Sequence, residues 1–241
     1  RAFSPRAFVR VAGFAVLFAG FLAGTMMFRK PERTDELATA LEFASSGDPT
    51  RMRQAMESFR RFRDARSRWL PLVVAMLDQP DPVARAAAVA LLAEVRADEA
   101  VGPLAARLGA GVESEDDVRE GVIRALRAIG DPSVVHALVE ASAREIEPDL
   151  AVAMGLAAFE LAIPGQDADL RQVADVLVGI VADGGAPRAA RRDAIEALRA
   201  HIAFDPAVAD EVAIASWWRD HRGAVAWRAA DRRLAVLGDG G

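Results

Sequence analysis

One arginine-led pattern recurs along the chain and constrains its fold more than any other feature. Each copy is an arginine followed by small or apolar residues three, six and seven positions later, and the copies start at Arg85, Arg119 and Arg191. The first two copies lie 34 residues apart and the third lies 72 residues further on, with a degenerate copy around Ala153 to Leu161. Residues at these spacings share one face of an α-helix. A repeat in the mid-thirties is typical of stacked helix pairs that bury their apolar faces against one another.

Proline, glycine and aspartate mark the junctions between the expected helices. Asp81 and Pro82 stand where a second helix should begin, since aspartate is a good N-cap and proline fits the first turn. On the buried face of this helix we expect Val83, Ala86, Ala87, Ala90, Leu91 and Val95. Later helices are expected near 149–163, 168–183, 187–204, 206–220 and 224–237. No stretch alternates with a period of two, so we predict no β-sheet.

The phrases that carry the repeat resemble the HEAT-repeat family, specifically its short bacterial members. The resemblance rests on Leu70-Pro71-Leu72 with Asp81-Pro82-Val83-Ala84-Arg85, and on Val118-Arg119 with Ala125-Leu126-Arg127-Ala128-Ile129-Gly130-Asp131-Pro132. It covers residues 69–204 well and the flanks loosely. It implies a curved α-solenoid that binds other proteins, and it implies no chemistry by itself. We therefore expect an all-α chain, with HEAT-like repeats over 69–204 and divergent capping helices over 205–241.

An uncharged stretch over residues 11–28 reads VAGFAVLFAGFLAGTMMF. At a rise of about 1.5 Å per residue it would form a helix of about 27 Å, close to the bilayer's hydrocarbon core of about 30 Å. The apolar region of a secretory signal is usually shorter, at about 7–15 residues. We therefore expect residues 1–30 to form a retained single-span transmembrane anchor, followed by a basic helical connector over 31–68.

Small residues in this stretch are spaced for close packing between helices. Ala15, Ala19 and Ala23 are four residues apart, and Gly20 and Gly24 form a GxxxG pattern. Small residues at this spacing let two helices approach closely in lipid. Two interpretations stay open: these residues pack against other membrane helices, or they reflect the ordinary abundance of glycine and alanine in spans.

Charge is distributed unevenly along the chain. Residues 1–33 carry a net charge of +5, residues 34–69 carry +1 and residues 70–241 carry −11. A basic collar suits anionic lipid head groups, whereas an acidic array argues against nucleic acid as a partner. Basic residues flank the expected span equally, so they do not orient it. Because long domains translocate largely regardless of charge, we expect the array on the periplasmic side of a bacterial inner membrane.

The expected helix over residues 49–67 is the most basic element of the chain. Its apolar residues form one stripe, and arginines occupy the remaining positions. Candidates for docking to lipid phosphates or to an acidic subunit are Arg53, Arg60, Arg61 and Arg63. The alternative is the ordinary solvated face of an amphipathic helix, with some arginines paired to the acidic array.

Three tryptophans near the C-terminus are further candidates for partner docking: Trp217, Trp218 and Trp227. Neighbouring residues on a helix point about 100° apart, so Trp217 and Trp218 cannot share one face. We expect one of them in the core and the other at a groove or interface, where tryptophan is enriched among hot spots. The alternative is that both close the open end of the solenoid.

No motif with recognisable catalytic chemistry occurs in the sequence. The chain has no cysteine, and His136, His201 and His221 stand alone, without metal-ligand or triad spacing. The acidic segment 113–117 lacks the spaced ligands and central glycine of an EF-hand. We therefore expect Asp116 or Asp117 to cap the helix that follows, with a bound cation as the alternative. We expect no catalytic residue, no cofactor, no metal and no enzymatic activity.

Together these features predict a non-catalytic scaffold anchored in the membrane. It would be an accessory subunit that binds other protein subunits and stabilises a multisubunit membrane complex, with a respiratory or photosynthetic complex as the candidate host. The alternative is an independent membrane-tethered adaptor that recruits soluble proteins transiently.

Overall fold

The computed structural model describes residues 31–44, 46, 48–61, 66–205 and 207–237. The chain divides into two compact units, Arg1–Trp69 and Leu70–Gly241. The expected membrane span, with the small residues Ala15, Ala19, Gly20, Ala23 and Gly24, lies outside the described residues. Across the described ranges, no helix combines the length and the apolar character that crossing a membrane requires.

Two helices and one turn of a third make up the described part of the N-terminal unit. Helix α2 (Pro31–Ala44) packs against α3 (Pro49–Arg61), and α4 (Arg66–Ala75) begins after the segment 62–65. Asp48 starts α3 because its carboxylate accepts the Thr50 N–H at 2.7 Å. Phe59 and Trp69 form a buried ring contact at 5.0 Å. The basic helix expected over 49–67 therefore ends at Arg61, and Arg66 already belongs to α4.

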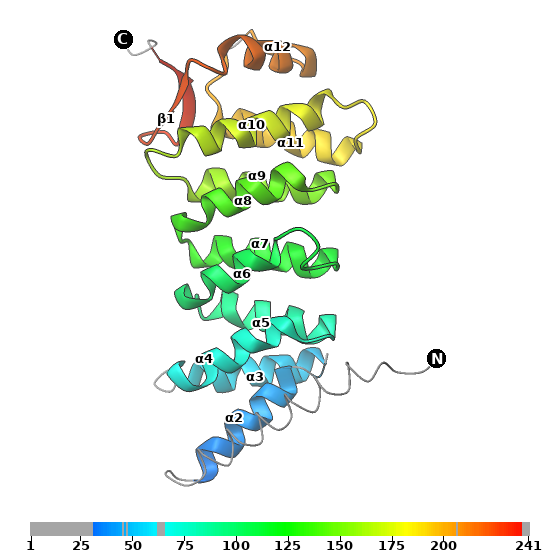
Figure 1. Cartoon of the computed structure of the whole chain (residues 1–241), viewed down its shortest axis with the longest axis vertical. Helices are drawn as coiled ribbons and strands as arrows, with labels where there is room; N and C mark the ends of the chain where they lie inside the picture. The colour runs from blue at the N-terminus through cyan, green and yellow to red at the C-terminus, as the bar shows by residue number, and fades with distance from the viewer. Residues whose placement is uncertain (1–30, 45, 47, 62–65, 206, 238–241) are drawn as a thin grey trace. The chain divides into compact units, whose positions relative to one another are not determined.

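The helices of the C-terminal unit stack in pairs that follow chain order (Figure 1). Each second helix packs on the next one: α5 contacts α7, α7 contacts α9, and α9 contacts α11. After α4 the elements are η2 (Met76–Asp78), α5 (Pro82–Glu94), η3 (Asp98–Ala100), α6 (Val101–Arg107), α7 (Asp116–Ile129), η4 (Pro132–Val134), α8 (Val135–Arg144), α9 (Pro148–Leu161), α10 (Asp167–Ala182), α11 (Arg188–His201), α12 (Glu211–His221), β1 (Val225–Arg228) and β2 (Arg233–Val236).

The expected junction residues define the ends of these helices. Asp81 caps α5 by accepting the Val83 N–H at 2.9 Å, and Pro82 occupies the first turn. Gly130 closes α7 in the left-handed conformation, with φ of 86°, and donates its N–H to the Leu126 carbonyl. Asp131 then caps η4 in the same way as Asp81 caps α5. The junctions were therefore predicted correctly at α5 and α7.

The arginine-led pattern gives the correct buried face for the second helices. The residues three, six and seven positions after each arginine are all buried, including Leu92, Leu126 and Leu198. The face predicted for α5 was partly wrong, because Val83 is 45% exposed and Ala86 and Ala90 face solvent. Alanines surround this helix on every side, so its apolar pattern does not distinguish the core face from the others.

The helix expected over 224–237 is instead an antiparallel hairpin, so the prediction of no sheet was wrong. Val225 of β1 lies opposite Val236 of β2. Each strand of the hairpin is also hydrogen-bonded to a neighbouring segment. The Ala203 N–H, which follows α11, donates to the Leu234 carbonyl of β2 at 2.8 Å, and the Trp227 N–H of β1 donates to Asp167 of α10 at 2.6 Å. These strand hydrogen bonds come from tertiary partners, and a four-residue strand is too short to show its period in the sequence.

Candidate protein-binding surfaces

The leading arginines Arg85 and Arg119 each pair with a glutamate that lies three residues before the next second helix, and Arg191 pairs with a glutamate at the start of α12. Arg85 binds Glu113 through two contacts of 2.7 Å, and Arg119 contacts Glu145 at 2.5 Å. A third pair, Arg191 with Glu211, is looser at 3.4 Å. We call these three pairs the arginine–glutamate ladder. Each leading arginine stands three residues after the first residue of its helix, and in α9 this position is Ala151, so the ladder skips that repeat.

Glu113 is the most enclosed carboxylate of the ladder. Its side chain is 0% exposed, and it also accepts hydrogen bonds from Arg107 at 3.0 Å and from the Glu115 N–H at 3.1 Å. Burial acts to raise the pKa of Glu113, but the hydrogen bonds from Arg85, from the Glu115 N–H and from Arg107 outweigh it and lower the pKa to about 2. The buried charge is therefore neutralised by two guanidinium groups.

The prediction that Asp116 or Asp117 caps the helix was wrong, although both side chains are exposed to solvent as expected. Helix α7 begins at Asp116, and its N-cap residue, Glu115, makes no side-chain capping bond. Asp116 instead pairs with Arg119 at 2.5 Å, within the first turn of the helix. Sequence reasoning missed the part that Glu113 plays. The similar spacing of the two pairs could have indicated this role, since Glu113 and Glu145 follow their arginines by 28 and 26 residues.

The connections from first to second helix lie along one edge of the C-terminal unit, at the right of the stack in Figure 1, and the start of α12 joins this edge through the pair of Glu211 with Arg191. The ladder fastens three of these segments, because Glu113, Glu145 and Glu211 each join their segment to the preceding second helix. We call this surface the ladder edge and define it by residues 78–83, 109–117, 145–149, 183–187 and 210–212. These five segments contain no lysine or arginine.

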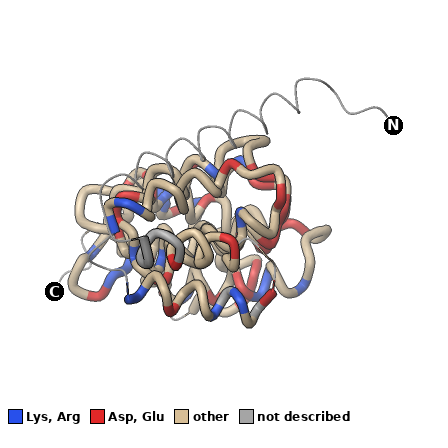
Figure 2. Tube along the Cα trace, turned by 90° about the horizontal axis from the view of Figure 1, so that it is seen from below, with Lys and Arg blue, Asp and Glu red and all other residues tan. Residues whose placement is uncertain are grey.

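The ladder edge is strongly acidic at its surface. Its exposed carboxylates are Asp78, Asp81, Glu115, Asp116, Asp117, Glu147, Asp149, Asp183 and Asp210. In Figure 2 the acidic positions gather at the right, the side on which these connections lie in Figure 1. Of the arginines beside the edge, Arg85, Arg119 and Arg191 are held in the ladder, and the exposed Arg144 pairs with Glu140 at 2.8 Å. Arg188 is exposed at the start of α11 and adds one positive charge beside residues 183–187.

Exposed aliphatic side chains interrupt this acidic edge. Val112 is 48% exposed and precedes Glu113, whereas Ile146 is 87% exposed and follows Glu145. Val83 lies two residues before Arg85, and Val212 follows Glu211. Each of these side chains therefore flanks a ladder residue. Among the described residues the other large exposed aliphatics are Ile163 and Leu237, which lie outside the ladder edge.

The three tryptophans have different surroundings. Trp218 is 3% exposed and donates from its indole to Asp175 at 2.8 Å, which confirms that one residue of the adjacent pair lies in the core. Trp227 is also buried and stacks on Phe159 at 6.4 Å. Trp217 is half-buried between Phe204, at 4.8 Å, and His221, at 4.5 Å. Trp217 is therefore the one of the three with surface left for a partner.

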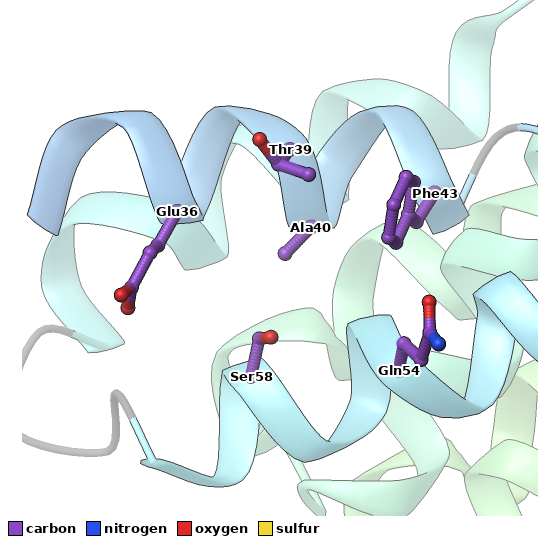
Figure 3. A pocket seen from close by; sticks show the side chains of 6 residues that line it. All are labelled: Glu36, Thr39, Ala40, Phe43, Gln54 and Ser58. Carbon is purple, nitrogen blue, oxygen red and sulfur yellow. The ribbon is translucent and has the colours of Figure 1, made fainter. Parts of the chain in front are cut away.

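The N-terminal unit carries exposed arginines on α3. Arg53, Arg60 and Arg61 are exposed on α3, and Arg63 lies outside the described residues. A shallow hollow of about 250 Å³ separates α2 from α3 (Figure 3), and its lining residues are Glu36, Thr39, Ala40, Phe43, Gln54 and Ser58. Glu36 is the one charged residue among them, so the hollow has no set of converging catalytic groups.

The histidines lie in three different settings. His136 is exposed and pairs with Asp169 at 2.9 Å, and this hydrogen bond raises the pKa of His136. His201 stacks on Phe159 at 4.8 Å, and burial lowers its pKa. The ring of His221 contacts the Trp217 carbonyl at 2.8 Å. Within the described ranges, no three metal-ligating side chains converge.

Comparison with known families identifies the repeat. Residues 70–157, which run from α4 into α9, match the family model of HEAT repeats. The repeats are HEAT-like. Searches of curated proteins and of solved structures found no match. The HEAT-like stack points to protein–protein interaction as the general role of this region.

Proposed function

We propose that the chain is a non-catalytic scaffold, anchored in the membrane, that binds and stabilises a multisubunit membrane complex as an accessory subunit. The observation that carries this proposal is the ladder edge, where a HEAT-like stack exposes aliphatic side chains on an acidic surface. Single exposed aliphatics are ordinary on a protein surface, so what supports the proposal is their recurrence beside the ladder on successive repeats of an acidic edge. Among the described residues, Glu113 is the most deeply buried carboxylate, and the hydrogen bonds that it accepts from Arg85 and Arg107 join two successive repeats.

Residues 11–28 would hold this scaffold in a bacterial inner membrane, with the repeats on the periplasmic side. The uncharged stretch is long enough to span a bilayer, and the basic residues beside it suit anionic head groups. Its small residues would pack against helices of the host, for which a respiratory or a photosynthetic complex is the candidate. The span and the ladder edge would then bind the same assembly at two places.

The protein should co-purify with membrane partners in a fixed ratio when it is isolated in a mild detergent. Replacement of both Gly20 and Gly24 by leucine should abolish this assembly, because leucine side chains keep helix backbones apart. The matched control is Leu22→Val, because in the proposed helix Leu22 would stand about 200° around the axis from Gly20. Recovery of the wild-type protein alone would contradict the proposal.

The topology of the chain can be measured with an introduced cysteine. The chain has none of its own, and Ser114 lies exposed on the ladder edge. In intact cells, a Ser114→Cys variant should react with a membrane-impermeant maleimide, because the repeats are proposed to face the periplasm. Labelling only after the inner membrane is permeabilised would place the repeats in the cytoplasm.

An independent adaptor that recruits soluble proteins transiently is the second candidate. The acidic surface of the ladder edge favours it, because contacts between exposed charges weaken strongly with salt. An adaptor would not need the small-residue face of the span. The adaptor would be favoured over the accessory subunit if the Gly20→Leu, Gly24→Leu variant still bound its partners and lost them in high salt.

A further inference from the structure

We propose that the ladder edge binds a basic segment of a partner protein in the polyproline II conformation, with aliphatic side chains at every third residue. This inference rests on the protein-binding part of the proposed function and is independent of the membrane anchor. The segment would lie along the stack, with its aliphatic side chains on Val83, Val112 and Ile146 and its lysines and arginines between them.

The spacing of the exposed aliphatics follows from the ladder. Val112 stands beside Glu113, which is bound to α5, and Ile146 stands beside Glu145, which is bound to α7. Successive sites are therefore offset by about one helix spacing, or about 8–10 Å for packed helices. A segment in the polyproline II conformation has three residues per turn and advances about 3.1 Å per residue, so residues three positions apart lie on one face and cover this step. An aliphatic side chain at every third position would meet successive repeats.

The charge of the edge selects a basic partner. The nine exposed carboxylates lie in segments without lysine or arginine, and the arginines beneath them are mostly engaged in the ladder. The N-terminal ends of α7 and α9 also face this edge, but Asp116, Asp117 and Asp149 already occupy their first turns. Phosphate groups of nucleic acids or anionic lipids would therefore be repelled, whereas lysine and arginine side chains would be attracted.

The test measures binding of a synthetic twelve-residue peptide, in which Leu-Lys-Arg is repeated four times, to the full chain in a nonionic detergent. Fluorescence anisotropy at near-physiological salt gives the Kd. The double variant Val112→Ser, Ile146→Ser should weaken binding about tenfold, because it removes the aliphatic contacts and keeps every charge. The matched control is Ile163→Ser, Leu237→Ser, which removes two similarly exposed aliphatics elsewhere and should change the Kd less than twofold.

A second pair of variants tests the charge. The triple variant Asp117→Asn, Glu147→Gln, Asp149→Asn should weaken binding several-fold, and its Kd should change less with salt concentration than that of the wild type. The control neutralises three exposed acids off the edge, Asp98, Glu196 and Asp220, and should have little effect. Circular dichroism and Tm verify that each variant is folded.

Three outcomes would overturn the proposal. These are equal effects of the edge and control variants, equal binding of a peptide with serine in place of every leucine, and preferred binding of an acidic peptide or of anionic vesicles. If the peptide fails to bind but membrane partners still co-purify, docking at the ladder edge is wrong and the scaffold function stands. If the peptide binds as expected but the protein is recovered from membranes alone, the accessory-subunit function is wrong.

Discussion

At the scale of single residues, Glu113 is the most informative position in the repeats. Its carboxylate has no exposed surface and is shared by Arg85 and Arg107, which come from helices of two successive pairs. A buried ion pair of this kind adds modest net stability while it is complete, but loss of one partner leaves charge buried without compensation. Glu113 therefore links two repeats through electrostatics as well as through packing.

Replacement of Glu113 by alanine should lower the free energy of unfolding by about 3 kcal/mol, because it leaves two arginines without their buried partner. Urea denaturation of the full chain in detergent, followed by circular dichroism, measures this change. The matched control is Glu120→Ala, which removes an exposed pair with Arg124 at 3.9 Å. That variant should change stability by less than about 0.5 kcal/mol, and equal effects of the two substitutions would contradict the role assigned to Glu113.

The effect of Glu113 should depend on pH in a defined direction. Its pKa is about 2 in the folded chain, below the ordinary value of 4.5. A lowered folded-state pKa contributes stability that is fully present above pH 4.5 and is lost as the pH falls toward 2. The difference in stability between the wild type and Glu113→Gln should therefore be largest above about pH 5 and should shrink toward pH 2. A difference that grows on acidification would reverse the sign of this argument.

At the scale of elements, the second helices were predictable and the C-terminal hairpin was not. The arginine-led pattern identified the buried faces of α5, α7 and α11 because its spacings repeat the helical period. The partners of those arginines were missed, because Glu113 and Glu145 become significant only when two repeats are stacked. Strand β1 depends on Asp167 and Arg171 of α10, which are more than fifty positions away in sequence. No local pattern reports such a contact.

The hydrogen bond between Asp167 and the hairpin should contribute to the stability of the hairpin's docking on α10. Its carboxylate accepts the Trp227 N–H at 2.6 Å, and Asp167→Ala would leave that half-buried amide without a partner. We expect a loss of about 1 kcal/mol and faster hydrogen exchange at the Trp227 amide than in the wild type. The control is Asp231→Ala in the hairpin turn, whose exposed pair with Arg228 should matter little. Unchanged exchange at Trp227 in Asp167→Ala would contradict this prediction.

At the scale of the whole molecule, the sequence predicted an anchor followed by HEAT-like repeats, and residues 70–157 match the HEAT-repeat family. The predicted span over residues 11–28 stays a prediction, because it lies outside the described residues. The candidate binding surface changed most between sequence and structure. Val83 was expected in the core and lies exposed on the ladder edge, because the N-cap at Asp81 places it at the start of α5.

The central claim is that this chain is a protein-binding scaffold that uses its ladder edge. The most direct test purifies three proteins from native membranes in mild detergent: the wild type, Val112→Ser with Ile146→Ser, and the control Ile163→Ser with Leu237→Ser. Quantitative mass spectrometry then compares what each retains. The account predicts that the wild type and the control retain the same membrane subunits in a fixed ratio and that the edge variant loses them. An unchanged set of subunits in the edge variant, or recovery of the wild type alone, would contradict it.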